Sequence, residues 1–202
     1  MNIYLVRHAE KDSSVKNTQK DHYNRRLTDI GLKQAKRLAN QLVPCSINKV
    51  FSSDMPRAFL TAEIVASKLR ISKIYKSQKL SEVDPCVIPN HPDRDKIKVI
   101  CWQKWDFKPE HGESYNEGKK RFNDFFWETI VESHNNKDNI LVVSHGRIIR
   151  LFLSEFLKGG IEAIKERYSH VAITHLDVNK KNKKIKVLIY NDNSFLPQCL
   201  RV

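Results

Sequence analysis

Two histidines follow short apolar segments near opposite ends of the chain. His8 comes after residues 2–6, with Arg7 directly before it, and His145 comes after residues 140–143. Each apolar segment predicts a short buried strand, and open α/β sheets bind ligands beyond the carboxyl ends of their strands. If the two strand ends meet, both imidazoles and the Arg7 guanidinium form a basic pocket suited to a phosphate group.

Five short motifs occur in an order that resembles the histidine phosphatase superfamily, the phosphoglycerate-mutase-like fold with a phosphohistidine intermediate. The two histidine motifs, R-H-[GA]-E and S-H-G, match at residues 7–10 and 144–146. The second-arginine motif S-S-x-x-x-R-A-x-x-T-A matches residues 52–62 and puts Arg57 at its key position. Weaker matches are L-T-x-x-G-x-x-Q-A at residues 27–35 and G-E-S at residues 112–114.

The resemblance implies a phosphatase in which His8 attacks the phosphorus atom and carries the phosphoryl group. Arg7 and Arg57 would bind the phosphoryl oxygens, because planar guanidinium groups match them with paired hydrogen bonds. A protonated His145 and the amide of Gly146, at the start of a helix, would stabilise the charge of the transition state. The attacking His8 must be neutral, and nearby cations are expected to keep it so.

The leaving group needs a proton donor, which members of this family supply from a carboxyl group after the second helix, often in a leucine-x-glutamate context. Residues 80–82 fit that context, so Glu82 is the candidate acid and Asp84 is the alternative. A carboxyl group in this role must be protonated near neutral pH. Glu10 and Glu113 lie inside other motifs and are not expected to take it.

Three other functions fit parts of this pattern. A phosphoglycerate-mutase-type phosphotransferase shares the nucleophile, but such members carry glutamate-arginine-histidine-tyrosine-glycine after the second helix. This chain reads L-S-E-V-D-P-C there, and Ala9 replaces the commoner glycine. A catalytically inert phosphate-binding or scaffolding module would usually have lost one of the histidines or arginines. A metal site between the histidines is disfavoured because two guanidiniums repel a cation, so no metal or cofactor is expected.

The charge balance favours anionic partners. The 202 residues include 36 Lys and Arg against 23 Asp and Glu, a formal net charge of +13. Such a field attracts a phosphorylated small molecule or a phosphoprotein. Nucleic acid is disfavoured because no binding motif is present, and the basic run at residues 179–184 is typical of a charged hairpin turn. The oligomeric state stays open.

The cysteines and the chain start favour a cytoplasmic protein. The four cysteines, at positions 45, 86, 101 and 199, lack C-x-x-C spacing, so free thiols are expected. The first residues already form the expected strand that carries His8, which leaves no place for a signal peptide. No apolar run has the length of a membrane span.

The hydrophobic pattern predicts a single domain over residues 1–202, built as a three-layer α/β/α sandwich with a mostly parallel central sheet. Apolar spacing predicts a helix over residues 31–42, after a polar loop at 11–26, and Pro56 suits the first turn of the next helix. Further strands are expected at residues 48–52, 73–75 and 140–144, helices at 114–133 and 147–157, and an antiparallel edge at 171–190.

Residues 80–112 contain four prolines and little periodicity, which predicts an irregular insertion at the rim of the pocket. Its aromatic residues Trp102, Trp105 and Phe107 either line the pocket or pack the insertion onto the core, and the second interpretation is favoured. The hydroxyl of Ser144 is expected to support His8 or to cap the following helix.

The remaining histidines lack neighbours of catalytic type in the sequence and are expected to be structural. His111, directly before G-E-S, keeps a second interpretation as a residue of the pocket edge. This group comprises His22, His91, His111, His134, His170 and His175.

Overall fold

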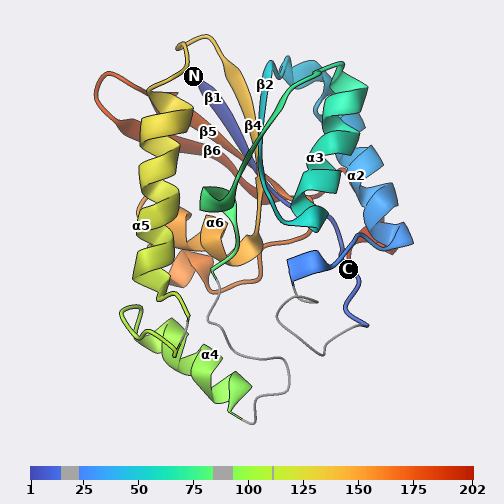
Figure 1. The fold of residues 1–202 in the computed structure, drawn as a ribbon. Helices are drawn as coiled ribbons and strands as arrows, with labels where there is room; N and C mark the ends of the chain where they lie inside the picture. The colour runs from blue at the N-terminus through green and yellow to red at the C-terminus, as the bar shows by residue number, and fades with distance from the viewer. Residues whose placement is uncertain (15–22, 84–92, 111) are drawn as a thin grey trace.

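One six-stranded sheet forms the centre of the computed structural model, which describes residues 1–14, 23–83, 93–110 and 112–202 (Figure 1). The strand order is β3-β2-β4-β1-β5-β6, with β1 to β4 parallel and β5 and β6 antiparallel at one edge. The strands are β1 Asn2–Arg7, β2 Lys49–Ser53, β3 Ile74–Ser77, β4 Asn139–Ser144, β5 Ile173–Asn179 and β6 Lys184–Asp192. The helices are α2 Asp29–Gln41, α3 Pro56–Leu69, α4 Arg94–Gln103, α5 Tyr115–Phe125 and α6 Gly146–Leu153.

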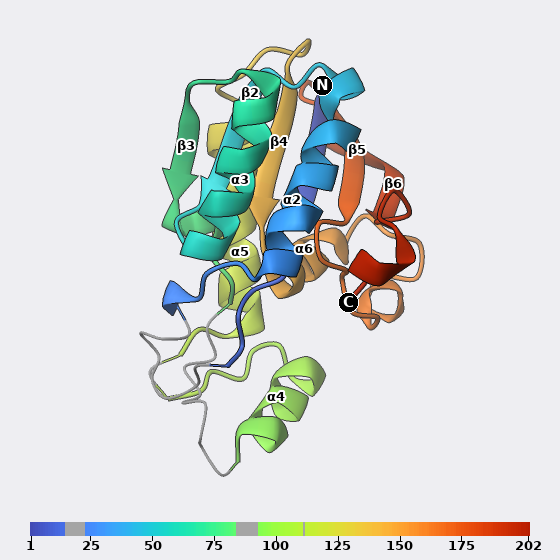
Figure 2. The same ribbon diagram turned by 90° about the vertical axis from the view of Figure 1, so that its right-hand side faces the viewer.

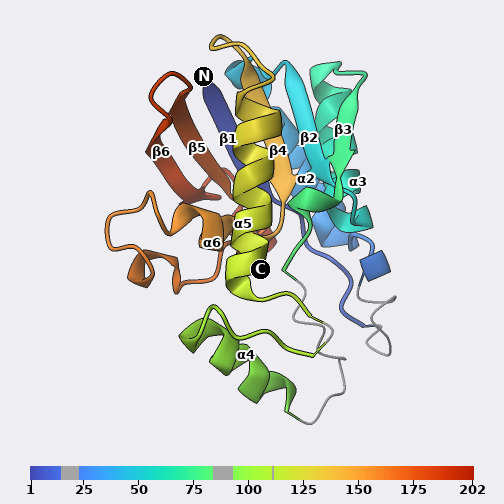
Figure 3. The same cartoon turned by 60° about the vertical axis from the view of Figure 1, so that its left-hand side comes forward.

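Alternating side chains of the central strands build the two hydrophobic layers. Ile3 and Leu5 of β1 pack with the aromatic residues of α5 and α6, whereas Tyr4 and Val6 pack with α2 and α3. Figure 2 shows α2 and α3 over one face of the sheet, and Figure 3 shows α5 over the other. Because successive strand residues point to opposite faces, a continuous apolar strand fills both layers. The predicted three-layer α/β/α sandwich is confirmed.

The register of the central strands sets the position of both histidines. Arg7, the last residue of β1, lies opposite Ser144, the last residue of β4. The amide of His8 then donates to the Ser144 carbonyl at 2.9 Å, so the pairing continues one residue past the strand. His8 and His145 therefore leave the sheet at the same level from neighbouring strands.

Three predicted elements differ from the structure. The helix expected at 114–133 is α5 followed by a π-helical turn, Phe126–Val131. The helix expected at 147–157 is α6, which ends at Leu153 and is followed by turns. The insertion expected to be irregular contains α4.

The segment with α4 lies beyond the carboxyl ends of the parallel strands (Figures 1 and 3). Trp102, Trp105 and Phe107 pack against the core layer of α5 and α6, with the Trp102 ring 5.1 Å from the Tyr115 ring. This packing agrees with the favoured interpretation of these aromatics.

Several expectations lie outside the described residues, namely those for His22, Asp84, Cys86, His91 and His111. The other three cysteines are free thiols, as expected. Within the described ranges, no helix is long and apolar enough to cross a membrane.

Candidate active site

The carboxyl edge of the sheet brings together the four basic residues that the motifs single out. The rings of His8 and His145 lie 5.1 Å apart between centroids and meet edge to face at 61°. Both histidines are buried, and so are Arg7 and Arg57, whose exposed fractions are 9% and 1%. Four nitrogen-rich side chains in one buried place can bind an anion and repel a metal cation.

His8 is held in one tautomer by its own backbone neighbour. Its Nδ1 lies 2.6 Å from the Ala9 carbonyl oxygen, which can only accept, so Nδ1 carries the proton in the neutral ring. Burial first, and then the charge of Arg57, lower the pKa of His8 well below 6.5. Burial thus acts in addition to the nearby cations expected from the sequence. The result is a neutral imidazole whose Nε2 lone pair is available for attack.

Arg7 reaches the site by passing over a glycine. A Cβ on Gly146 would lie 3.1 Å from Cδ of Arg7 and 3.2 Å from its Nε, tighter than ordinary packing. The guanidinium donates to the carbonyl of Tyr168, which fixes its far end. The glycine of the S-H-G motif is thus required by the path of Arg7.

Arg57 is positioned at the start of α3, where Pro56 occupies the first turn as predicted. Thr61, one turn further, donates to the Arg57 carbonyl at 2.7 Å and accepts from the Ala9 amide at 3.1 Å. One threonine hydroxyl therefore ties α3 to the loop that carries His8. Burial lowers the pKa of Arg57 to about 10.

A chain of hydrogen bonds determines the tautomer of His145. Asp54 accepts from the Tyr23 hydroxyl at 2.5 Å and from the Ser81 hydroxyl at 2.6 Å. Since the Ser81 proton is used there, Ser53 must donate to Ser81 across 3.1 Å. The Ser53 oxygen is then an acceptor for Nε2 of His145 at 2.8 Å. His145 therefore carries its proton on Nε2.

The other ring nitrogen of His145 is left with a lone pair. Nδ1 is buried and has no hydrogen-bond partner among the described residues. Burial first, then Arg57, lower the pKa of His145 well below 6.5. In the ligand-free protein the ring is therefore neutral, because it is buried and lies near Arg57 and Arg7. The protonated His145 expected in the transition state stays a prediction.

Glu82 lies at the amino end of α6. One carboxylate oxygen accepts from the Ile148 amide at 2.9 Å and the other from the Arg147 amide at 3.2 Å. Negative charge is favoured at this end of a helix, where the first amides have no partner within the helix. Glu82 thus takes the capping position expected for Ser144, whose hydroxyl instead donates to the Leu80 carbonyl at 2.6 Å.

The G-E-S motif supports the segment that carries Glu82. Glu113 forms two hydrogen bonds of 2.7 Å with Arg121, and Arg121 also donates to the carbonyls of Lys79 and Ser81. That Glu113 is not the acid stays a prediction.

Two residues beside the site were missed by the sequence argument. The ring of His170 lies 5.9 Å from that of His8, and burial lowers its pKa to about 3. Burial and the nearby Arg57 lower the pKa of Lys11 to about 7. Lys11 directly follows the first motif, which was a usable signal, whereas nothing in the sequence around His170 connects it to His8.

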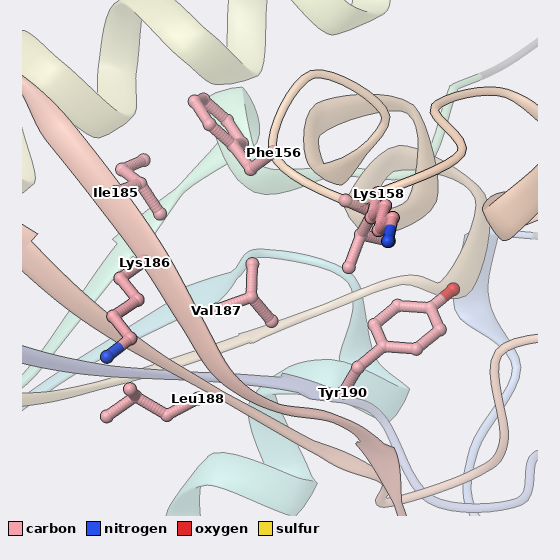
Figure 4. Close-up of a pocket in the computed structure, with 8 residues that line it drawn as sticks. Phe156, Lys158, Ile185, Lys186, Val187, Leu188 and Tyr190 are labelled. Carbon is pink, nitrogen blue, oxygen red and sulfur yellow. The ribbon is translucent and has the colours of Figure 1, made fainter.

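Two cavities occur among the described residues near the sheet. A small one, about 160 Å³ in volume, borders Arg7, Glu82 and Gly146. A larger one of about 450 Å³ lies along β6, where Figure 4 shows Phe156, Val187 and Tyr190 around it. None of the site residues lines the larger cavity, so of these two cavities among the described residues the small one adjoins the candidate site. No group of metal-ligating side chains occurs in the described part of the chain.

A family model described as the histidine phosphatase superfamily (branch 1) matches residues 3–192. The mitochondrial serine/threonine-protein phosphatase Pgam5 of Drosophila grimshawi is 31% identical over 207 residues, which is 98% of this chain. The chain spans 65% of the length of that relative. The adenosylcobalamin/α-ribazole phosphatase of Escherichia coli is 26% identical, with 93% of this chain and 95% of the relative covered.

Solved structures share the fold. A putative α-ribazole-5′-P phosphatase from Escherichia coli superposes with a TM-score of 0.76 and 24% identity, over 95% of this chain and 96% of that one. A mycobacterial glucosyl-3-phosphoglycerate phosphatase, in complex with inorganic phosphate, gives 0.77 at 18% identity, over 97% and 99% of the two chains.

Proposed function

This chain belongs to the histidine phosphatase superfamily, branch 1, and from that premise we propose that it is a phosphomonoester phosphatase with His8 as its nucleophile. The observation that carries the proposal is the neutral His8 ring, fixed by Ala9, 5.1 Å from His145 and flanked by two buried arginines. Phosphatases among its relatives support it.

In the first step, Nε2 of His8 attacks the phosphorus atom and the bond to the leaving oxygen breaks. Arg7, Arg57 and the amide of Gly146 hold the other phosphoryl oxygens. Glu82 takes up a proton when the phosphate dianion binds beside it, and gives that proton to the departing alkoxide. Each donor of this kind contributes roughly 2.7–4 kcal/mol to transition-state stabilisation in comparable anion sites. In the second step, water attacks phosphorus, Glu82 takes its proton, and the nitrogen–phosphorus bond breaks.

His145 changes its protonation state in this scheme. Its Nδ1 has a lone pair in the ligand-free protein, and a bound phosphate dianion raises the affinity of that nitrogen for a proton. The ring then donates from both nitrogens, from Nε2 to Ser53 and from Nδ1 toward the phosphate. The bound substrate therefore brings about the cationic form of His145 that is expected in the transition state.

Substrate class and location are also proposals. A phosphorylated small molecule and a phosphoprotein both suit the basic site, and the names of the relatives include phosphatases of each kind. We keep the cytoplasm as the expected location, although the relatives named Pgam5 are mitochondrial.

Phosphate release from a panel of phosphomonoesters tests the function. The wild-type protein should release phosphate, and His8→Ala should lose at least about 1,000-fold in kcat, because the nucleophile is gone. His134→Gln serves as the control and should keep the wild-type rate, because His134 precedes β4 and contacts Ile130 and Phe51. Release by His8→Ala at the wild-type rate would contradict the mechanism, and no release by any protein would contradict the function.

The leaving group reports on Glu82. For Glu82→Gln, kcat should fall by about 100-fold or more on alkyl phosphates and much less on 4-nitrophenyl phosphate, whose phenolate leaves without a proton. An equal loss on both substrates would remove Glu82 from the role of acid and favour Asp84.

A further inference from the structure

The small cavity beside Arg7 is lined by an excess of positive charge. Four of its lining residues are arginines (Arg7, Arg147, Arg150 and Arg167), and Glu82 is the carboxylate among them. Both Glu82 oxygens already accept amides of the first turn of α6, which offsets its charge. Within the described residues, none of the four arginines forms a salt bridge.

Two of these arginines already have other partners. Arg150 donates to the carbonyls of Gly146 and of residues 164–166, and its guanidinium lies 4.6 Å from the centre of the Trp102 ring. Arg7 is bound to the Tyr168 carbonyl and belongs to the phosphate site.

The other two have donors to spare. Arg147 makes one side-chain hydrogen bond, to the Val83 carbonyl at 3.2 Å, and its buried Nε has no partner in the described part of the chain. The guanidinium of Arg167 is exposed and makes no hydrogen bond or ion pair with the described residues. Together they present two guanidinium groups at one cavity.

The size of the cavity limits the ligand. Its volume of about 160 Å³ admits a carboxylate or a phosphate group, and drug-sized ligands need roughly 300–1,000 Å³. Arg7 and Gly146 border both this cavity and the proposed phosphate site, so the two adjoin.

We propose that Arg147 and Arg167 form a second anion site, which selects phosphomonoesters that carry another carboxylate or phosphate group close to the scissile one. The inference rests on the proposed phosphatase activity and assigns its substrate class. Planar guanidinium groups bind both kinds of anion with paired, charge-assisted hydrogen bonds.

Matched substrates test it. Phosphoserine and phosphoethanolamine differ by one carboxylate, and propane-1,3-diol bisphosphate and monophosphate differ by one phosphate. The wild-type protein should prefer the more anionic member of at least one pair by about tenfold or more in kcat/KM, with most of the difference in KM. The pair that shows the preference identifies the anion.

The variants Arg147→Gln and Arg167→Gln should each reduce that preference several-fold. The exposed Arg167 can be replaced without disturbing the core, which keeps the test usable if Arg147→Gln fails to fold. Arg37→Gln, an exposed arginine of α2, removes the same charge elsewhere and should keep the preference. The proposed anion site would be overturned if the wild-type protein showed nearly equal kcat/KM for the two substrates of both pairs. It would also be overturned if both variants kept the wild-type preference. If no substrate is hydrolysed at all, the proposed function has failed instead.

Discussion

At the scale of single residues, the hydroxyl of Ser53 decides which nitrogen of His145 carries a proton. The carboxylate of Asp54 fixes the direction of the hydrogen bonds through Ser81 to Ser53, and the buried Ser53 oxygen accepts from Nε2. Ser53 is therefore a positioning residue, which acts on the reaction only through His145.

Ser53→Ala should lower kcat by about 10- to 100-fold, because a displaced or wrongly protonated ring no longer meets the transition state. Nitrogen-15 NMR of His145 should show the Nε2-protonated tautomer in the wild-type protein and a mixture in the variant. The matched control is Ser52→Ala, since the equally buried Ser52 hydroxyl donates to the Ser53 carbonyl and does not contact His145. Equal losses in both variants with an unchanged tautomer would show a merely structural role.

The side chains that touch the phosphate in this account could be predicted from sequence, since Arg7, His8, Arg57 and His145 sit in ordered motifs. The protonation of His145 could not, because it depends on burial and on how close Arg57 and Lys11 lie in space. The approach of His170 to His8 likewise results from the fold and leaves no local pattern.

At the scale of elements, α2 packs against the loop after His8 with no room between them. A Cβ on Gly31 would lie 2.1 Å from the backbone oxygen of Glu10. Thr28, which caps α2, also donates to the Glu10 carboxylate at 2.5 Å, and Gln34 accepts from the Glu10 amide at 2.7 Å. The L-T-x-x-G-x-x-Q-A motif thus holds the backbone beside the nucleophile.

Gly31→Ala should therefore lower the free energy of unfolding by about 1–3 kcal/mol, although alanine is the better helix former. Urea unfolding measures it, with Lys33→Ala on the exposed face of α2 as a control expected within about 0.5 kcal/mol of the wild type. A Gly31→Ala protein as stable as the control would mean that the helix and the loop can move apart at little cost.

Elements with strong apolar periodicity were predicted close to their observed bounds, as for α2 and the central strands. Those that depend on tertiary contacts were not. α4 packs on the core through Ile97 and Trp102. Prolines precede and follow this short helix in the sequence, so its helical pattern was not recognised.

At the scale of the whole molecule, three buried histidines, His8, His145 and His170, are neutral because folding lowers their pKa values. The unfolded chain binds more protons than the folded one below the ordinary pKa of about 6.5. Above pH 6.5 these histidines are neutral in both states and do not lower the free energy of unfolding. Below pH 6.5 the unfolded chain takes up protons that the folded protein does not, so the free energy of unfolding falls. Net positive charge adds repulsion in acid.

Each such histidine adds up to about 1.4 kcal/mol of lost stability per pH unit below 6.5. Urea unfolding between pH 6 and pH 4.5 should show the free energy of unfolding falling with pH. In His170→Gln the slope should be smaller by the contribution of one proton, up to about 1.4 kcal/mol per pH unit. An unchanged slope in His170→Gln would show that His170 is protonated in the folded state.

The most direct measurement is a rapid quench of the wild-type protein in alkaline detergent during turnover of a phosphate-labelled substrate, followed by peptide mapping at alkaline pH. The account predicts a phosphoryl group on His8 that is stable in alkali and lost in acid, and no label on His8→Ala. Steady phosphate release from a wild-type protein that never carries this label would contradict it.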